Sequence, residues 1–211
     1  DSLVDSVTNY GDDTGLGGEV RGNYATLNPL TKGSYITLSN GNLEAVGTSS
    51  SDNGNYRSNI AVSSGKWYAE VTCQGVGNSN NPRVGIILAE HAQSPTNSGG
   101  SSTVAYDSDS AGYLNDGGLI SGGSTITQAS SYTTGDVIGI AVDADNGAVY
   151  FSKNGVFQNS GVPTSGATKT GAVKTWSGSK NYLFAGSDFN NSKCVWNFGQ
   201  RAWSYAPPSG Y

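Results

Sequence analysis

Hydrophobic and polar residues alternate along residues 136–158, DVIGIAVDADNGAVYFSKNGVFQ. Side chains of a β-strand point alternately to the two faces of a sheet, so Ile138, Ile140 and Val142 share one face. The polar and glycine residues between the apolar runs are typical of tight turns. The pattern predicts three consecutive antiparallel strands joined by two hairpin turns.

Both turns of this segment contain Asn-Gly, but the pattern favours different loop lengths. A two-residue type I′ turn at 146–147 places Val142 opposite Phe151 on one apolar face. A three-residue loop over 153–155 places Phe151 opposite Phe157 and holds its glycine in the left-handed region. We therefore predict one two-residue turn and one bulged three-residue turn.

Short strand-like segments continue at regular spacing from Tyr24 to the end of the chain, separated by Gly, Asn and Ser. This spacing indicates an all-β fold, an antiparallel β-sandwich. Residues 1–22 are rich in Gly and Asp and are expected to form an arm or linker, followed by one β-sandwich domain over 23–211. Residues 90–103 and 160–180 form long polar loops, which are uncommon in compact domains unless they are functional or mobile.

The amino-acid composition limits the kinds of molecule that this chain is expected to bind. The chain has 211 residues, of which 13% are charged and 31 are glycine, and its formal net charge is −5. The basic residues are scattered singly, which argues against nucleic acid because phosphates require a clustered positive face. The sequence has no run of 18 apolar residues, so we expect no membrane insertion. These features favour an extracellular or particle-surface location, and the start at Asp1 without any Met suggests a fragment or processed product.

The two cysteines, Cys73 and Cys194, each share strand parity with apolar residues. Both are therefore expected to face the core, where Cys commonly packs as a small buried hydrophobe. Buried free thiols are the favoured interpretation. The sequence does not decide whether the two cysteines form a disulfide, because the bond requires Cα atoms within about 7 Å of each other.

Three blocks occur in order along the chain: SSGKWYAEVT at 63–72, the meander at 132–156, and VWNFGQRAWSYAPPSGY at 195–211. Together they resemble the SPRY domain, especially the form found at the C-terminal ends of phage and phage-like virion structural proteins. The resemblance implies a bent sandwich of two antiparallel sheets, similar to concanavalin-type jelly rolls. It also implies a binding module rather than an enzyme, with no cofactor and with ligands met by loops at one edge.

The resemblance leads to two hypotheses about function. In the first, the chain is a virion surface domain of a tail fibre or capsid decoration. It would bind other virion proteins, associate with itself, or adhere to a host-surface glycan or protein. In the alternative, it is a cellular, lectin-like carbohydrate-binding domain. Variable loops on a shared scaffold suggest a binding surface in either case.

Aromatic residues supply the main candidates for core and site. Trp67, Trp196 and Phe198 occupy alternating strand positions and are predicted to be core. Trp176 lies between Lys174 and the polar run Ser177–Gly178–Ser179 in the 160–180 loop. We therefore expect it to be exposed and to contact a partner, with simple loop packing as the alternative. The first interpretation predicts that Trp176→Ala weakens binding with little change in stability.

A second candidate ligand site lies around Asp107 and Asp109, which Tyr106 and Tyr113 bracket in the sequence. Aromatic rings beside carboxylates suit carbohydrate, through stacking and hydrogen bonds to hydroxyl groups. The same pattern also suits a solvated hairpin tip.

No catalytic or metal site is predicted. The run 143–147 resembles the start of a calcium loop, but its spacing places Gly147 and Ala148 where a ligand and an obligatory glycine are needed. As a glycosidase pair, Asp143 and Asp145 are poor candidates, because they sit together on one turn. His91, the single histidine, has too few neighbouring ligands for zinc.

Overall fold

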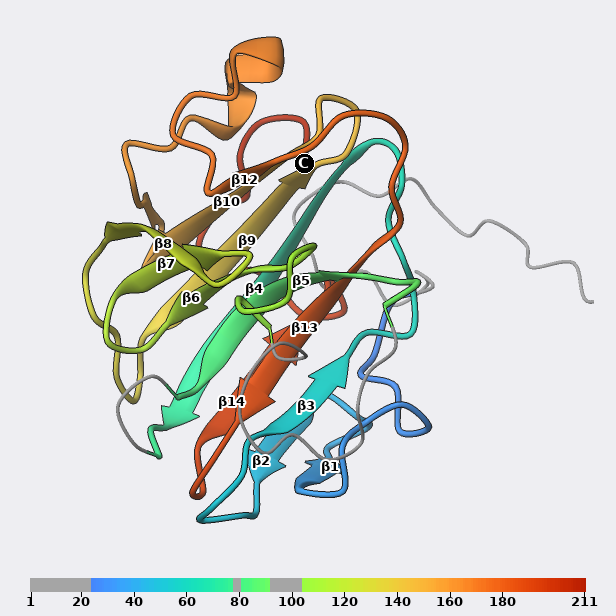
Figure 1. The fold of residues 1–211 in the computed structure, drawn as a ribbon, viewed down its shortest axis with the longest axis vertical. Coiled ribbons are helices and arrows are strands. Elements are labelled where there is room, and N and C mark those ends of the chain that lie inside the picture. Colours follow the sequence, from blue (N-terminus) through green and yellow to red (C-terminus); the bar gives the residue numbers. More distant parts are fainter. Residues whose placement is uncertain (1–23, 78–80, 92–103) are drawn as a thin grey trace, which may run out of the picture.

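The computed structural model describes residues 24–77, 81–91 and 104–211, which form two antiparallel β-sheets packed face to face (Figure 1). The predicted all-β sandwich is confirmed. The predicted arm over 1–22 and most of the 90–103 loop lie outside the described residues.

The first sheet has eight strands in the order β1-β2-β14-β4-β9-β10-β11, and β12 also pairs with β10. The long strands β4 and β9 lie side by side near its centre. The strands are β1 (Ile36–Ser39), β2 (Glu44–Gly47), β14 (Lys193–Asn197), β4 (Lys66–Gly75), β9 (Val137–Asp143), β10 (Ala148–Lys153), β11 (Val156–Phe157) and β12 (Lys174–Thr175).

The second sheet has six strands, in the order β3-β13-β5-β6-β7-β8. They are β3 (Gly54–Arg57), β13 (Tyr182–Asp188), β5 (Arg83–Leu88), β6 (Ala111–Leu114), β7 (Gly118–Ser121) and β8 (Ser124–Gln128). The predicted 160–180 loop contains a short 3₁₀ helix, Pro163–Thr168, as well as β12. Because β12 pairs with β10, this segment is attached to the first sheet.

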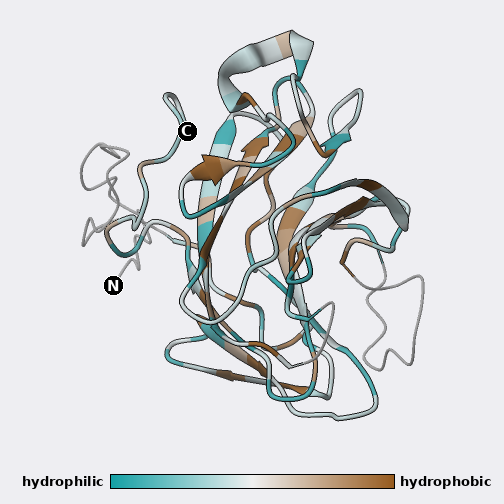
Figure 2. Ribbon diagram, turned by 90° about the vertical axis from the view of Figure 1, so that its left-hand side faces the viewer, coloured by the Kyte–Doolittle hydropathy of each residue, from teal (hydrophilic) through white to brown (hydrophobic). Residues whose placement is uncertain are grey.

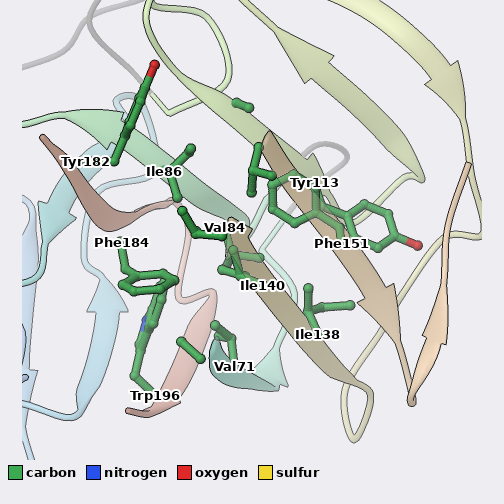
Figure 3. Packing of buried hydrophobic residues seen from close by; sticks show 14 of the residues in the cluster. Val71, Val84, Ile86, Tyr113, Ile138, Ile140, Phe151, Tyr182, Phe184 and Trp196 are labelled. Atoms are coloured by element: carbon green, nitrogen blue, oxygen red, sulfur yellow. The ribbon is translucent and has the colours of Figure 1, made fainter. Parts of the chain in front are cut away.

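The hydrophobic core fills the space between the two sheets. Val71, Ile138 and Ile140 of the first sheet pack against Val84 and Ile86 of the second (Figure 3). Each fully buried aliphatic side chain contributes about 1.5–3 kcal/mol relative to an exposed one. The most hydrophobic segments lie on the strands, whereas the connecting loops are mainly hydrophilic (Figure 2).

The first turn of the meander differs from the predicted one. Val142 lies opposite Val149 instead of the predicted Phe151, and residues 144–147 form a four-residue loop. The carboxylate of Asp143 accepts hydrogen bonds from the backbone N and the Nδ2 of the loop asparagine, at 3.0 and 2.8 Å, and so stabilises the longer turn. Because the pairing moves by an even number of residues, the predicted inner face is retained.

The second turn is shorter than predicted. Ser152 pairs with Phe157, so 154–155 is a two-residue turn whose φ values are 48° and 79°. Positive φ at both positions is the type I′ geometry. The predicted pairing of Phe151 with Phe157 is therefore wrong, although the left-handed glycine is confirmed. The turn asparagine accepts a hydrogen bond from the backbone N of Val137 at 2.8 Å, which anchors the tight turn to β9.

Replacing Gly155 with valine is expected to lower the free energy of unfolding by about 1–3 kcal/mol. Gly155 has a φ of +79°, and an added Cβ would lie 2.8 Å from Cδ1 of Tyr205. Urea denaturation measures the loss. Gly178→Val is the matched control, because Gly178 has a φ of +72° but nothing in the described part of the chain lies within 4 Å of the added Cβ. A wild-type midpoint for Gly155→Val would contradict the turn assignment.

The C-terminal segment crosses the outer face of the first sheet. Buried Glu70 of β4 accepts backbone hydrogen bonds from Ser204 and Tyr205, both at 2.8 Å. Trp203 packs edge to face on Tyr68, with ring centroids 5.1 Å apart. These contacts hold the end of the chain against the outer face of the first sheet.

Candidate binding surface

A polar cavity of about 400 Å³ lies beside the β9–β10 turn, and we call it the loop cavity. Three segments and one lysine line it: 63–64 before β4, the turn 144–147, Lys169, and 176–179 after β12. Serine, asparagine and aspartate side chains dominate this lining. The cavity therefore offers hydrogen-bond donors and acceptors together with apolar surface of similar extent.

Hydrogen bonds join the walls of the loop cavity. Oδ1 of Asp145 accepts the backbone N–H of Gly65 at 2.6 Å, which ties the β9–β10 turn to the segment before β4. The backbone N–H of Trp176 donates to the carbonyl of Gly147 at 3.0 Å. Nζ of Lys169 donates to the Trp176 carbonyl at 3.2 Å. Hydrogen bonds between three loops therefore hold the walls of the cavity in place.

Trp67 is bonded to Ser64, which lines the loop cavity, and it is 46% exposed, so its predicted place in the core is wrong. Its Nε1 donates to the carbonyl of Ser64 at 2.6 Å, which holds the indole beside the cavity rim. Trp67 pairs with the core residue Val142 and therefore starts from the inner face of the sheet. However, it is only the second residue of β4, where its ring extends past the part of the sheet that the core covers.

Trp176 is buried, not exposed as the sequence predicted. It is 8% exposed, belongs to the main core cluster, and lies with its ring centroid 4.5 Å from that of Tyr182. The missing apolar neighbours come from the sheet, because β12 pairs Lys174 with Val149 and brings the segment onto the core. The alternative of loop packing describes Trp176 correctly, and a direct ligand contact stays a prediction.

Tyr113 is also a core residue. It is completely buried on β6, its hydroxyl donates to the carbonyl of Ser130, and its ring packs at 5.1 Å from that of Tyr132. Tyr106 is half-buried outside this cluster, and the guanidinium of Arg83 lies 4.9 Å from its ring centroid. The two tyrosines therefore do not form one aromatic site around the aspartates.

Asp107 and Asp109 hold the turn before β6. Oδ2 of the buried Asp107 lies 2.9 Å from Nε2 of His91, and its Oδ1 accepts the backbone N–H of Asp109 at 2.9 Å. Asp109 forms an ion pair with Lys180 at 2.9 Å, and this hydrogen bond lowers the pKa of its carboxyl. Both carboxylates already have partners within the protein, which favours a structural role.

The same turn is attached to the segment that carries Trp176. Nζ of Lys174 donates to the carbonyl of Ser108 at 3.0 Å, and Lys180 reaches Asp109. The structure thus attaches the turn of Asp107 and Asp109 to both sides of the segment that contains Trp176.

The described ranges contain no cluster of three or more His, Cys, Asp or Glu side chains that could hold a metal ion. The carboxylates of Asp143 and Asp145 bind the donors of Asn146 and Gly65, so the interpretation of 143–147 as a turn is confirmed. Within the part of the chain that the structure describes, no helix is long and apolar enough to cross a membrane.

A model of the SPRY domain matches residues 66–201, which span β4 to β14 and include both Trp67 and the turn 144–147. The chain belongs to the SPRY family. No curated protein matches the sequence. SPRY domains are generally binding modules that mediate protein interactions.

Solved SPRY domains share the fold. The SPRY domain of human HERC1 aligns with a TM-score of 0.61 at 18% identity, covering 81% of this chain and 96% of that one. Another human SPRY domain aligns at 0.58 and 18% identity, covering 78% of this chain and 96% of its own. The TRIM65 PSpry domain aligns at 0.56 and 10% identity, covering 82% and 89%. At these identities the likeness shows that the chain shares the fold, and it does not identify a ligand.

The residue that sequence reasoning missed is Trp67. The alternation of apolar and polar residues placed Trp67 correctly on the inner side of β4. It could not show that the core does not extend over the beginning of this strand. The available signal was its position two residues after the polar turn Ser63–Ser64–Gly65, at the beginning of a strand.

Proposed function

We propose that this SPRY domain is a non-enzymatic binding module that contacts its partner through the loop cavity and Trp67. The observation that carries the proposal is a large exposed indole, fixed by its bond to Ser64, beside a hydrogen-bonding cavity. Tryptophan offers a large contact area at small entropic cost, and polar groups around it supply specificity.

We also propose that the domain is displayed outside cells on a virion, as part of a tail fibre or capsid decoration. There it would bind other virion proteins or further copies of itself, or adhere to the host surface. The support is the similarity of its sequence blocks to virion C-terminal domains and its composition, with only 13% charged residues in the whole chain. One shallow polar cavity binds weakly, and repetition on a particle would supply avidity.

The second candidate function is recognition of a glycan by a cellular, lectin-like domain. It is favoured by the serine hydroxyls and the side chains of Asp145 and Asn146 that line the loop cavity, and by the exposed indole of Trp67, which is bonded to the carbonyl of the lining residue Ser64. A sugar ring has an apolar face that stacks on an indole and hydroxyl groups that bind such side chains. Free sugar would then compete with the natural ligand.

Trp67→Ala is expected to weaken binding to the target surface about tenfold or more, which corresponds to about 1.4 kcal/mol per tenfold. The melting temperature should stay within about 2 °C of wild type, because exposed positions contribute little stability. Ile126→Ala on β8 is the matched control, since Ile126 is also 46% exposed but lies in the other sheet. Equal binding by both variants would contradict the proposed surface.

The partner class is tested by displaying the labelled domain on beads and measuring binding to intact cells before and after their surface polysaccharide is stripped. Saturable binding that disappears with the polysaccharide supports glycan recognition. Binding that survives stripping supports a protein receptor. If the beads bind no cells but the domain binds purified particles, assembly is the supported role.

A further inference from the structure

The two cysteines of the chain lie directly opposite one another on neighbouring strands. In the register of β4 and β14, Cys73 is the cross-strand partner of Cys194, although the two are far apart in sequence. Both belong to the core cluster and are almost completely buried, which confirms the sequence prediction. The thiols are free in this structure.

The hydrogen bonds of Cys73 show which kind of pair this is. Its N–H donates to the carbonyl of Asp136 at 2.9 Å, and its carbonyl accepts the N–H of Gly135 at 2.8 Å. Both backbone groups are thus used on the side away from β14. Cys73 and Cys194 consequently form a non-hydrogen-bonded pair, the type that brings Cα atoms to about 4.5 Å and the side chains closest together.

The separation typical of such pairs lies within the range of about 4.4–6.8 Å in which disulfides form, and the Cys73–Cys194 pair is the first one after a register shift between Lys193 and Cys194. Both side chains belong to the same face, because directly opposed residues of antiparallel strands project to one side. Neither sulfur has a strong competing partner, since Sγ of Cys73 lies 3.6 Å from the Gly75 carbonyl and Sγ of Cys194 lies 3.8 Å from Oδ1 of Asp188.

We propose that Cys73 and Cys194 form a cross-strand disulfide when the chain folds under oxidising conditions, and that this bond locks β4 to β14. A small disulfide such as oxidised glutathione supplies the oxidising equivalents. One thiolate attacks its S–S bond to give a mixed disulfide and one released thiol, and the second cysteine then displaces the other thiol. Two protons and two electrons leave the protein, and two glutathione thiols form.

The burial of the pair determines when the reaction occurs. Burial raises the pKa of the Cys73 thiol to about 11 and that of Cys194 well above its usual range. Because thiolate is the reactive form, the folded reduced protein reacts slowly, and the bond forms while the strands are assembling. Once formed, the bond closes a loop on the order of 100 residues long. A crosslink across such a loop restricts the unfolded chain strongly, so it is expected to stabilise the folded state.

The test is to refold the full chain in a glutathione redox buffer and, in parallel, in excess reductant. Each sample is then denatured, alkylated and measured by intact mass and peptide mapping. We expect no alkylation and a peptide linking Cys73 to Cys194 in the oxidised monomer. We also expect a melting temperature about 5–15 °C above that of the reduced monomer.

The matched controls are Cys73→Ala and Cys194→Ala, in which the melting temperature should be the same in both buffers. If neither variant folds, the wild-type comparison still decides. Two alkylated cysteines in the monomer refolded with glutathione would overturn the proposal. Disulfides found only between chains would overturn it as well.

Discussion

Replacing Trp176 with alanine is expected to lower the free energy of unfolding by about 3–5 kcal/mol, the usual cost of truncating a buried aromatic residue. Trp176 is a member of the core cluster and packs on Tyr182, and its backbone closes the loop cavity through Gly147. Truncation leaves a void and removes support from the wall 176–179. Urea denaturation followed by tryptophan fluorescence and circular dichroism measures the loss.

The informative control for this variant is Trp67→Ala, which removes an indole of the same size from an exposed site. The structure predicts opposite results for the two tryptophans: a large loss of stability at 176, and a loss of binding without loss of stability at 67. Wild-type stability for Trp176→Ala, together with weakened binding, would restore the original expectation that Trp176 is an exposed ligand contact.

The protein is expected to lose about 3 kcal/mol of its free energy of unfolding through Asp188 as the pH rises from about 4 to above 6. Asp188 is the last residue of β13 and is completely buried. Burial raises the pKa of its carboxyl from 3.8 to about 6. A hydrogen bond of 2.7 Å from Oγ of Ser192 and contacts with Tyr56 and Cys194 favour ionisation but do not offset burial.

The sign follows from proton binding. Between about pH 4 and pH 6 the folded state holds a proton on Asp188 that the unfolded chain has released, so raising the pH favours unfolding. Below about pH 4 both states are protonated and the penalty disappears. Above about pH 6 the buried carboxylate is ionised and the penalty is complete. Each pH unit between the two pKa values is worth about 1.4 kcal/mol.

Asp188→Asn isolates this effect, because asparagine is neutral throughout and keeps an oxygen that can accept from Ser192. Urea denaturation of both proteins across this pH window should show the difference in their unfolding free energies changing by about 3 kcal/mol. Groups with lowered pKa values, such as Asp109, Asp136 and Glu44, are common to both proteins and cancel. Parallel stability curves would contradict a raised pKa at Asp188.

The strands and turns of residues 136–158 show which structural features a local sequence pattern predicts. Alternation correctly predicted the strands of 136–158 and the face of Val142, and Asn-Gly correctly marked both turns. Loop lengths were wrong at both turns. The side chain of Asp143 lengthens the first turn, and the bond to Val137 tightens the second. These contacts depend on where the side chains point once the strands have paired.

The sequence by itself determined the all-β scaffold, the inner and outer sides of the strands, and the SPRY blocks, because these depend on period-two alternation and turn residues close together in the chain. Only the tertiary structure decided which tryptophan is exposed, that Cys73 faces Cys194, and that 63–65, 144–147 and 176–179 share one cavity. Burial at a strand end depends on whether a distant segment covers it. Pairing between strands that are distant in sequence decides whether such a segment covers the strand end, and a local residue pattern does not predict this pairing.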